Sequence, residues 1–429
     1  MKKSVLAVLL AVAASLAQAG PRIEHWTAPS GARVLFIESR VVPIVDIQID
    51  FAAGGAYAPA GLAGLAGLTR GLLDTGAGDL DEEKIADRLA DTGATLGGGA
   101  DLDRASISLR SLASPHEREA AVELMRLVLQ QPSFPAAALD REKARAIAGI
   151  READTRPASI AAKRFAAAIY PDHPYGRVPT AESVGQITRE DVKAFYLAHY
   201  GARRAVVSII GDLSRTEAEA IAQRLTDGLP DAPAEVSLPD TALPAQSTLR
   251  VEHPAAQAHI QLGLPAVRRG DPDYIPLLVG NYILGGGGFV SRLMKEVREK
   301  RGYAYSVYSY FQPQKQPGPF QVGLQTKREQ AGAALKVVED VLAEFLARGP
   351  SEAELRAAKR NLADGFPLRI DSNRKLLDYL SAIGFYGLPL TYLDDFSRKV
   401  EAVTVADIRA AFARHVKPEH FVTVIVGGV

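Results

Sequence analysis

The stretch ITREDVKAFYLAHYGARRAVVSIIGDL, residues 187–213, recurs 216 positions later as VTVADIRAAFARHVKPEHFVTVIVGGV, residues 403–429. In each copy a Thr stands three residues before an Asp, which is the spacing of a capping box at the start of a helix. An amphipathic helix pattern follows, and then a β-branched run that ends in glycine. The stretch therefore predicts a helix and a strand in each of two homologous halves.

The repeat extends, more loosely, towards the start of each half. The strand pattern DIQIDF at 46–51 corresponds to HIQLGL at 259–264. We expect a first domain over residues 20–230, a linker rich in Pro, Ala and Ser over 231–247, and a second domain over 248–429. Strands and helices occur in runs, so we expect an α+β fold in which each domain packs helices on a mainly antiparallel sheet. Two similar domains that face each other also create a cleft, where ligands tend to bind.

Composition excludes several classes of protein. The 50 Lys and Arg balance the 50 Asp and Glu over 429 residues, and no basic patch indicates a nucleic-acid partner. Cysteine does not occur, so the chain offers neither a disulfide nor a thiolate ligand for a metal. We therefore expect a globular protein that ordinary core burial holds together.

Residues 1–19 have the pattern of a secretory signal peptide. Lys2 and Lys3 precede an apolar run, and Ala17-Gln18-Ala19 is a cleavage signal of the A-x-A type. The alternative is an N-terminal membrane anchor, for which this apolar run is short. We expect the segment to be removed, which leaves a periplasmic or secreted protein without a membrane span.

Four landmarks occur in order along the mature chain: DFAAGGAY (50–57), GLAGLTRGLLDTG (64–76), VVSIIGDL (206–213) and LGGGGFVSRLMKEVREKRGYAYSVYSYF (284–311). This pattern resembles the insulinase-like (pitrilysin-type) zinc peptidases, the inverzincin family that includes the mitochondrial processing peptidase. The resemblance covers essentially the whole mature chain. It implies that the two domains form half of a clamshell, and that two such halves enclose a chamber for a peptide.

The catalytic members of that family carry H-x-x-E-H on the first helix and a further Glu about seventy-five residues later. Two His at i and i+4 lie on one helical face and bind zinc, while the intervening Glu activates the bound water. Here the corresponding positions are Gly67, Arg70 and Gly71, and the distal position falls at Ala148 or Gly149. The eight histidines form no substitute cluster. We expect no metal and no cofactor in this chain, and zinc in a partner subunit.

The second domain retains a pair of residues that the resemblance assigns to substrate. The pattern predicts a helix over 291–302 with Gly302 as its C-cap, and a strand over 303–311. Arg298 on the helix and Tyr305 on the strand match the family's Arg/Tyr pair, which reaches towards the peptide bond at the partner's zinc. An Arg offers several fixed donors, and a Tyr hydroxyl can stabilise an oxyanion. The alternative interpretation is a surface Arg and a packed strand aromatic.

Residues Gly285, Gly286, Gly287 and Gly288 form a run before that helix. The run lacks the spacing of a nucleotide-binding loop. It resembles the glycine-rich segment of the non-catalytic subunit of the processing peptidase, which implies a flexible, substrate-contacting loop at the border of the chamber. A plain turn into the helix is the alternative interpretation.

The resemblance implies a non-catalytic, substrate-binding subunit of a secreted or periplasmic heterodimeric zinc metallopeptidase. Its partners would be a homologous catalytic subunit bearing H-x-x-E-H and peptide substrates. The alternative function is that of a catalytically dead pseudopeptidase, a peptide-binding or structural scaffold. Retention of Arg298 and Tyr305 favours the first hypothesis, since a pure scaffold has no need of them.

Overall fold

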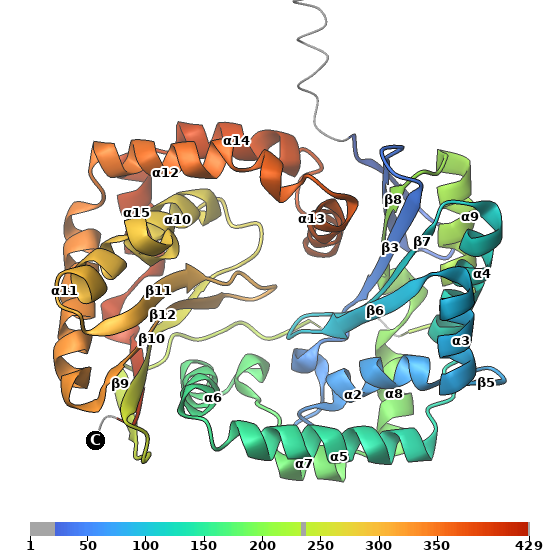
Figure 1. Cartoon of the computed structure of the whole chain (residues 1–429), viewed down its shortest axis with the longest axis horizontal. Helices are drawn as coiled ribbons and strands as arrows, with labels where there is room; N and C mark the ends of the chain where they lie inside the picture. The colour runs from blue at the N-terminus through green and yellow to red at the C-terminus, as the bar shows by residue number, and fades with distance from the viewer. Residues whose placement is uncertain (1–21, 233–236, 428–429) are drawn as a thin grey trace, which may run out of the picture.

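The computed structural model describes residues 22–232 and 237–427 and places two sheets on opposite sides of the molecule (Figure 1). Over those residues the first sheet has the strand order β1-β2-β8-β3-β7-β6, and the second has the order β11-β12-β10-β13-β9. Most strand pairs are antiparallel, and the parallel ones are β2 with β8 and β9 with β13. The expected α+β fold is confirmed. The expected signal peptide, residues 1–19, lies outside the described residues.

The first half of the chain, residues 22–232, supplies one sheet and the helices around it. Its strands are β1 (Glu24–Thr27), β2 (Arg33–Glu38), β3 (Ile44–Phe51), β6 (Thr95–Ala100), β7 (Ala105–Leu112) and β8 (Val206–Gly211), with a small hairpin of β4 (Gly76–Ala77) and β5 (Leu80–Asp81). Its helices are α2 (Leu65–Leu72), α3 (Glu82–Thr92), α4 (Pro115–Gln130), α5 (Ala136–Ala153), α6 (Pro157–Ile169), α7 (Ala181–Gln186), α8 (Arg189–His199) and α9 (Arg215–Thr226).

The second half, residues 237–427, repeats this plan with a few changes. Its strands are β9 (Ser247–Val251), β10 (Gln257–Val267), β11 (Ala304–Phe311), β12 (Gly318–Lys327) and β13 (Val422–Val426). Its α-helices are α10 (Tyr274–Asn281), α11 (Ala331–Arg348), α12 (Glu352–Asp364), α13 (Asn373–Tyr386), α14 (Tyr392–Ala402) and α15 (Val405–His415). Two π-helices, Tyr282–Gly286 and Met294–Glu299, stand between α10 and β11. None of the helices described is both long and apolar enough to cross a bilayer.

The repeated stretch forms the same structure in both halves. α8 and α15 each begin with the expected capping box, Thr188 with Asp191 and Thr404 with Asp407. The strand that follows each helix inserts beside the first long strand of its half, so that β8 pairs antiparallel with β3 and β13 with β10. β3 and β10 are thereby inner strands, each with a neighbouring strand on both sides.

One helix from each half packs against the sheet of the other half. α6 packs against β10 and β13 of the second sheet, and α13 packs against β3 and β8 of the first (Figure 1). On α13, Gly384 allows the close approach, because a Cβ atom there would lie 2.4 Å from a methyl of Val206 and 2.7 Å from one of Leu35. The Gly384 carbonyl accepts a hydrogen bond from the Arg33 guanidinium at 3.0 Å. The two halves are therefore tied together within one chain.

A buried polar cluster lies where α13 meets the first sheet. Asp50 is fully buried; it accepts a hydrogen bond from Ser381 at 2.6 Å and pairs with Arg104 at 3.2 Å. Burial raises the pKa of Asp50, an effect that the charge of Arg104 and the hydrogen bonds oppose. Next to Arg104, the Asp103 carboxylate accepts bonds from the backbone N–H of Lys315 at 2.8 Å and from Tyr386 at 3.0 Å. Residues far apart in sequence thus meet in one network at the seam.

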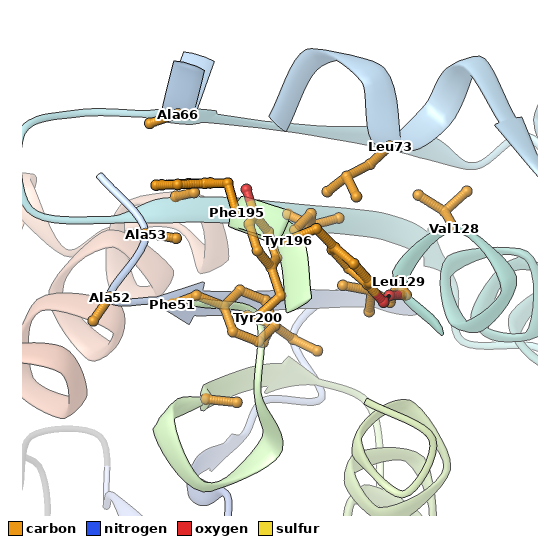
Figure 2. Close-up of a cluster of buried hydrophobic side chains, with 14 of the residues drawn as sticks. Phe51, Ala52, Ala53, Ala66, Leu73, Val128, Leu129, Phe195, Tyr196 and Tyr200 are labelled. Carbon is orange, nitrogen blue, oxygen red and sulfur yellow. Dashed lines mark hydrogen bonds between the residues drawn. The ribbon is translucent and has the colours of Figure 1, made fainter. Parts of the chain in front are cut away.

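An aromatic cluster supports α2 from below (Figure 2). The rings of Phe51 and Tyr200 lie 4.9 Å apart, and those of Tyr196 and Tyr200 lie 5.3 Å apart. The Tyr196 hydroxyl donates a hydrogen bond to the Leu129 carbonyl at 2.6 Å. Leu73, just after α2, is fully buried and lies above these rings (Figure 2). This packing fixes the helix that carries the positions of the expected degenerate zinc site.

Candidate functional site

The two ligand positions of α2 face open space. Gly67 and Gly71 lie one turn apart on the exposed side of the helix. A Cβ atom built on either glycine would meet no other atom within 4 Å, apart from its own helix. The backbone therefore leaves room for the side chains of a metal site, and the glycines supply none. These residues do not fit a zinc ion, which needs about four donor atoms.

Arg70, at the position of the catalytic Glu, is directed into the fold. It is 7 % exposed, and its Nε donates to the Ser106 carbonyl at 2.8 Å. Nη2 donates to the Gly97 carbonyl, and Nη1 lies 3.8 Å from the carboxylate of Asp74. Burial raises the pKa of Asp74, and the charge of Arg70 opposes that shift. The side chain at the position that the resemblance assigns to the general base thus links α2 to β6 and β7.

The distal position on α5 also lacks a carboxylate. Ala148 and Gly149 are exposed. Upstream on the same helix, Glu142 is engaged by Arg145 at 2.9 Å and by Arg141 at 3.2 Å. The position that would complete the metal site therefore offers no donor.

One cluster of potential metal ligands occurs elsewhere among the described residues: Asp271, Asp273 and His415. The Asp273 carboxylate is already bound by both arms of Arg414, at 2.6 and 2.7 Å, and by His415 Nε2 at 2.9 Å. The Nδ1 of His415 contacts the Ala266 carbonyl at 2.9 Å. At the repeat-equivalent position of the first half, His199 Nδ1 contacts the Ala52 carbonyl at 3.2 Å. Both histidines therefore anchor the end of a helix to the end of a central strand.

Arg298 and Tyr305 come together in the second half. Arg298 lies in the last turn of the π-helix Met294–Glu299, and Tyr305 stands on the edge strand β11. The guanidinium carbon of Arg298 lies 4.6 Å from the ring centroid of Tyr305 and 4.8 Å from that of Phe289. Tyr305 is 75 % exposed and Phe289 is 64 % exposed. Two exposed rings therefore flank one guanidinium, a cation–π arrangement that leaves its N–H edge available.

No residue that the structure describes forms a hydrogen bond or ion pair with the Arg298 side chain. The neighbouring Arg301, by contrast, pairs with Glu296 at 2.9 Å. A guanidinium presents up to five donors in a fixed fork, which suits a carbonyl or a carboxylate. The Arg298 guanidinium can thus donate hydrogen bonds to an acceptor group from outside the chain.

The glycine run differs from the expected flexible loop. It is wound into the end of the π-helix Tyr282–Gly286 and the 3₁₀ turn Gly288–Val290. A Cβ on Gly285 would lie 2.4 Å from the Ser309 hydroxyl, and one on Gly286 would lie 2.6 Å from the Asn281 amide. The segment is helical where the sequence predicts a flexible loop, because Gly285 and Gly286 pack closely against β11 and α10; its contact with a substrate stays a prediction. The entry-turn interpretation describes the segment better.

The glycine run and the Arg/Tyr pair line the same hollow, of about 550 Å³. Its wall includes Gly285, Gly286, Gly288, Phe289, Arg298 and Tyr305. The helix end is also as expected, since Gly302 has a positive φ of 63° and its N–H bonds to the Arg298 carbonyl at 2.9 Å. The structure therefore unites residues that the sequence separates by up to twenty positions.

Sequence reasoning missed Phe289. The available signal was an aromatic residue directly after four glycines, at a site that patterning assigns to a turn. An exposed aromatic next to a turn has no role in a core, so its position favours contact with a ligand.

Both halves of the chain match models of one family. Residues 33–180 match insulinase (peptidase family M16), and residues 186–362 match the peptidase M16 inactive domain. A crystal structure described as a peptidase M16 inactive domain from Pseudomonas fluorescens is 40% identical, with a TM-score of 0.92, over 95% of this chain and 98% of that one.

Further relatives cover the chain to different extents. The non-peptidase homolog YmxG of Helicobacter pylori is 25% identical over 97% of this chain and 96% of its own length. The fold also matches the periplasmic protease PqqL from Escherichia coli, with a TM-score of 0.81 and 17% identity, over 95% of this chain and 45% of that one. Uncharacterized zinc proteases of mycobacteria are 32% identical over 64% of each chain, so the alignment spans less than two thirds of their length.

Proposed function

The chain belongs to peptidase family M16, and we propose that it is the non-catalytic, substrate-binding subunit of a heterodimeric zinc metallopeptidase. The partner would be a homologous subunit that carries H-x-x-E-H and the zinc. The pair would process or degrade peptides in the periplasm or outside the cell. The signal-like residues 1–19 support the location.

The observation that carries this proposal is the state of Arg298. Its guanidinium is held between the rings of Phe289 and Tyr305 and has no partner among the residues described. The cation–π contacts hold the half-buried guanidinium in place but satisfy none of its N–H donors, which are left for an acceptor group on a ligand. The ligand in a peptide chamber would be a backbone carbonyl or a terminal carboxylate.

The two subunits would contribute different groups to one active site. The positions on α2 supply no donor for a metal, so the zinc and the activated water would come from the partner. This chain would supply Arg298 and the Tyr305 hydroxyl, which would orient the peptide and stabilise the charge that develops on its carbonyl oxygen. This chain covers 45% of the PqqL chain, which is therefore long enough to hold a second unit of similar size, and this supports a partner for the present chain.

A scaffold without any part in proteolysis is the second candidate. It is favoured by Arg70, whose role in this structure is to join α2 to the sheet. A scaffold needs neither the exposed aromatic pair nor the free guanidinium. The two candidates are therefore separated by substitutions at Arg298 and Tyr305.

The test uses the complex of this chain with an H-x-x-E-H homologue from the same genome. We expect Arg298→Ala and Tyr305→Phe to lower kcat/KM for peptide cleavage by about 10²-fold, the typical effect of removing one oxyanion donor. The matched control is Arg301→Ala, which removes the same charge three residues away and should leave cleavage unchanged. Zinc content and complex formation should stay at the wild-type level in all three variants. A Tyr305→Phe complex with wild-type kcat/KM would leave the scaffold as the better account.

A further inference from the structure

The second half contains another hollow, of about 420 Å³, that shares no lining residue with the hollow of Arg298. It lies between α10 and α14, and Gly270 and Leu388 belong to the loops that border it. Its volume falls within the range of small-molecule sites, which are mostly apolar and carry a few placed polar groups. Nothing in the proposed peptidase function uses this hollow.

Its walls are apolar and fixed. Tyr274, Tyr392 and Phe396 supply aromatic surface. The Phe396 ring is stacked on Phe366 with centroids 4.2 Å apart, and the Tyr392 ring lies 6.5 Å from that of Tyr379. Because these rings are held by neighbours outside the hollow, the cavity is formed in advance of any ligand.

Arg269 places a positively charged side chain in this apolar wall. Its Nε is buried and unbonded, and no hydrogen bond or ion pair to its side chain occurs among residues 22–232 and 237–427. The guanidinium lies 5.4 Å from the ring centroid of Tyr386. The backbone N–H of Arg269 donates to the Gln314 carbonyl at 2.8 Å, which fixes the base of the side chain. Arg269 lines the hollow, so the N–H donors at the end of its guanidinium are left for an acceptor group on a ligand.

The other charged groups of the wall are engaged. Asp407 caps α15 through Thr404, and Asp271 accepts the backbone N–H of Asp273 at 2.8 Å. Lys399 lies 3.6 Å from Asp395 on the same helix. Arg269 is therefore the group of this wall whose charge is left for a ligand.

We propose that this hollow binds a carboxylate attached to an aromatic or branched apolar body. The apolar part would lie against Tyr392 and Phe396, and the carboxylate would accept the N–H donors of Arg269. A molecule the size of 3-phenylpropionate has this chemistry, and so does the C-terminal residue of a peptide that ends in phenylalanine.

Isothermal titration calorimetry on the full mature chain tests the proposal with two probe pairs. The first is 3-phenylpropionate and its amide, and the second is the tripeptide Gly-Gly-Phe and its C-terminal amide. We expect each acid that fits to bind about tenfold or more tightly than its amide, the usual effect of a charge-assisted hydrogen bond. Binding of the first acid alone would identify a free small acid as the ligand, and binding of the tripeptide would identify a peptide terminus.

Three variants localise the effect. Arg269→Gln should remove the preference for acid over amide, while Arg268→Gln should retain it, because Arg268 pairs with Asp240 at 2.7 Å and does not line the hollow. Ala402→Trp should fill the exposed mouth and abolish binding without removing a native contact. Equal affinity for acid and amide, no binding of either acid, or wild-type binding by Ala402→Trp would overturn the proposal.

Discussion

Two arginines have opposite roles in this chain. Arg70 is buried, and backbone carbonyls of β6 and β7 accept hydrogen bonds from its guanidinium. Arg298 has its faces against two exposed rings and its donors free of any described partner. The residue at the position of the catalytic base therefore serves the fold, and the residue in the second half is available for a ligand.

Replacing Arg70 tests its structural role. Arg70→Met keeps an unbranched side chain but leaves the Ser106 and Gly97 carbonyls without their donor. We expect a loss of about 2 to 4 kcal/mol in the free energy of unfolding, because buried acceptors lose charge-assisted bonds. Urea unfolding followed by circular dichroism measures the change. Arg88→Met, on the exposed face of α3, should stay within about 0.5 kcal/mol of the wild type. A similar small effect for Arg70→Met would contradict the role assigned to it.

His199 predicts a dependence of stability on pH. Burial lowers its pKa to about 4 in the folded protein, against about 6.5 for an exposed histidine. Between these values the unfolded chain binds a proton that the folded chain does not, so stability falls as the pH falls, by at most about 1.4 kcal/mol per unit. Chemical unfolding at several pH values between 7 and 4.5 should show a steeper loss for the wild type than for His199→Gln. Parallel curves for the two proteins would show that His199 titrates normally.

At the scale of elements, the sequence was sufficient for the regular parts. The capping boxes of α8 and α15, the strands β8 and β13, and the positive-φ end at Gly302 were all predicted, because each depends on residues within one or two turns. The π-helices around the glycine run were not predicted. They depend on Asn281 and Ser309, which approach the glycines only after β11 has packed against α10.

The candidate site was predictable in part. Gly67, Gly71, Arg298 and Tyr305 were located through motif spacing, and their proposed roles stay predictions. The inward direction of Arg70 could not be predicted, since its acceptors lie on strands about 30 residues further along the chain. Contacts of that kind are set by tertiary packing, which a local pattern does not encode.

Two glycines of α-helices should respond to substitution in opposite ways. On α13, Gly384→Ala would place a Cβ 2.4 Å from Val206, and we expect a loss of about 1 to 3 kcal/mol from overpacking. On α11, a Cβ on Gly332 meets nothing within 4 Å, so Gly332→Ala should stabilise the protein by about 0.5 to 1 kcal/mol. Thermal unfolding measures both shifts. Stabilisation by Gly384→Ala would contradict the close packing of α13 on the first sheet.

At the scale of the molecule, α6 and α13 join the two halves, because each of these helices packs on the sheet of the opposite half. The seam is further closed by the hydrogen bonds of Ser381 to Asp50 and of Tyr386 to Asp103. The exposed rings of Phe289 and Tyr305 lie at the edge of the second sheet and are not covered by any described part of the chain. An apolar surface of this kind favours association with another protein.

We therefore expect a heterodimer with a catalytic homologue. After co-expression, size-exclusion chromatography should give one peak that contains both chains at micromolar concentration, as expected for a stable interface. Separate elution of the two chains would contradict the partnership, and a homodimeric peak of this chain would support the scaffold.

The most direct test of the central claim is a zinc determination on the purified chain and on the complex. Elemental analysis should find only traces of zinc in this chain alone, and about one zinc per heterodimer, as expected if the partner alone supplies the ligands. Peptide cleavage should occur in the complex and stop when a chelator removes the metal. One zinc per chain in the isolated protein, together with proteolysis that a chelator abolishes, would contradict the account.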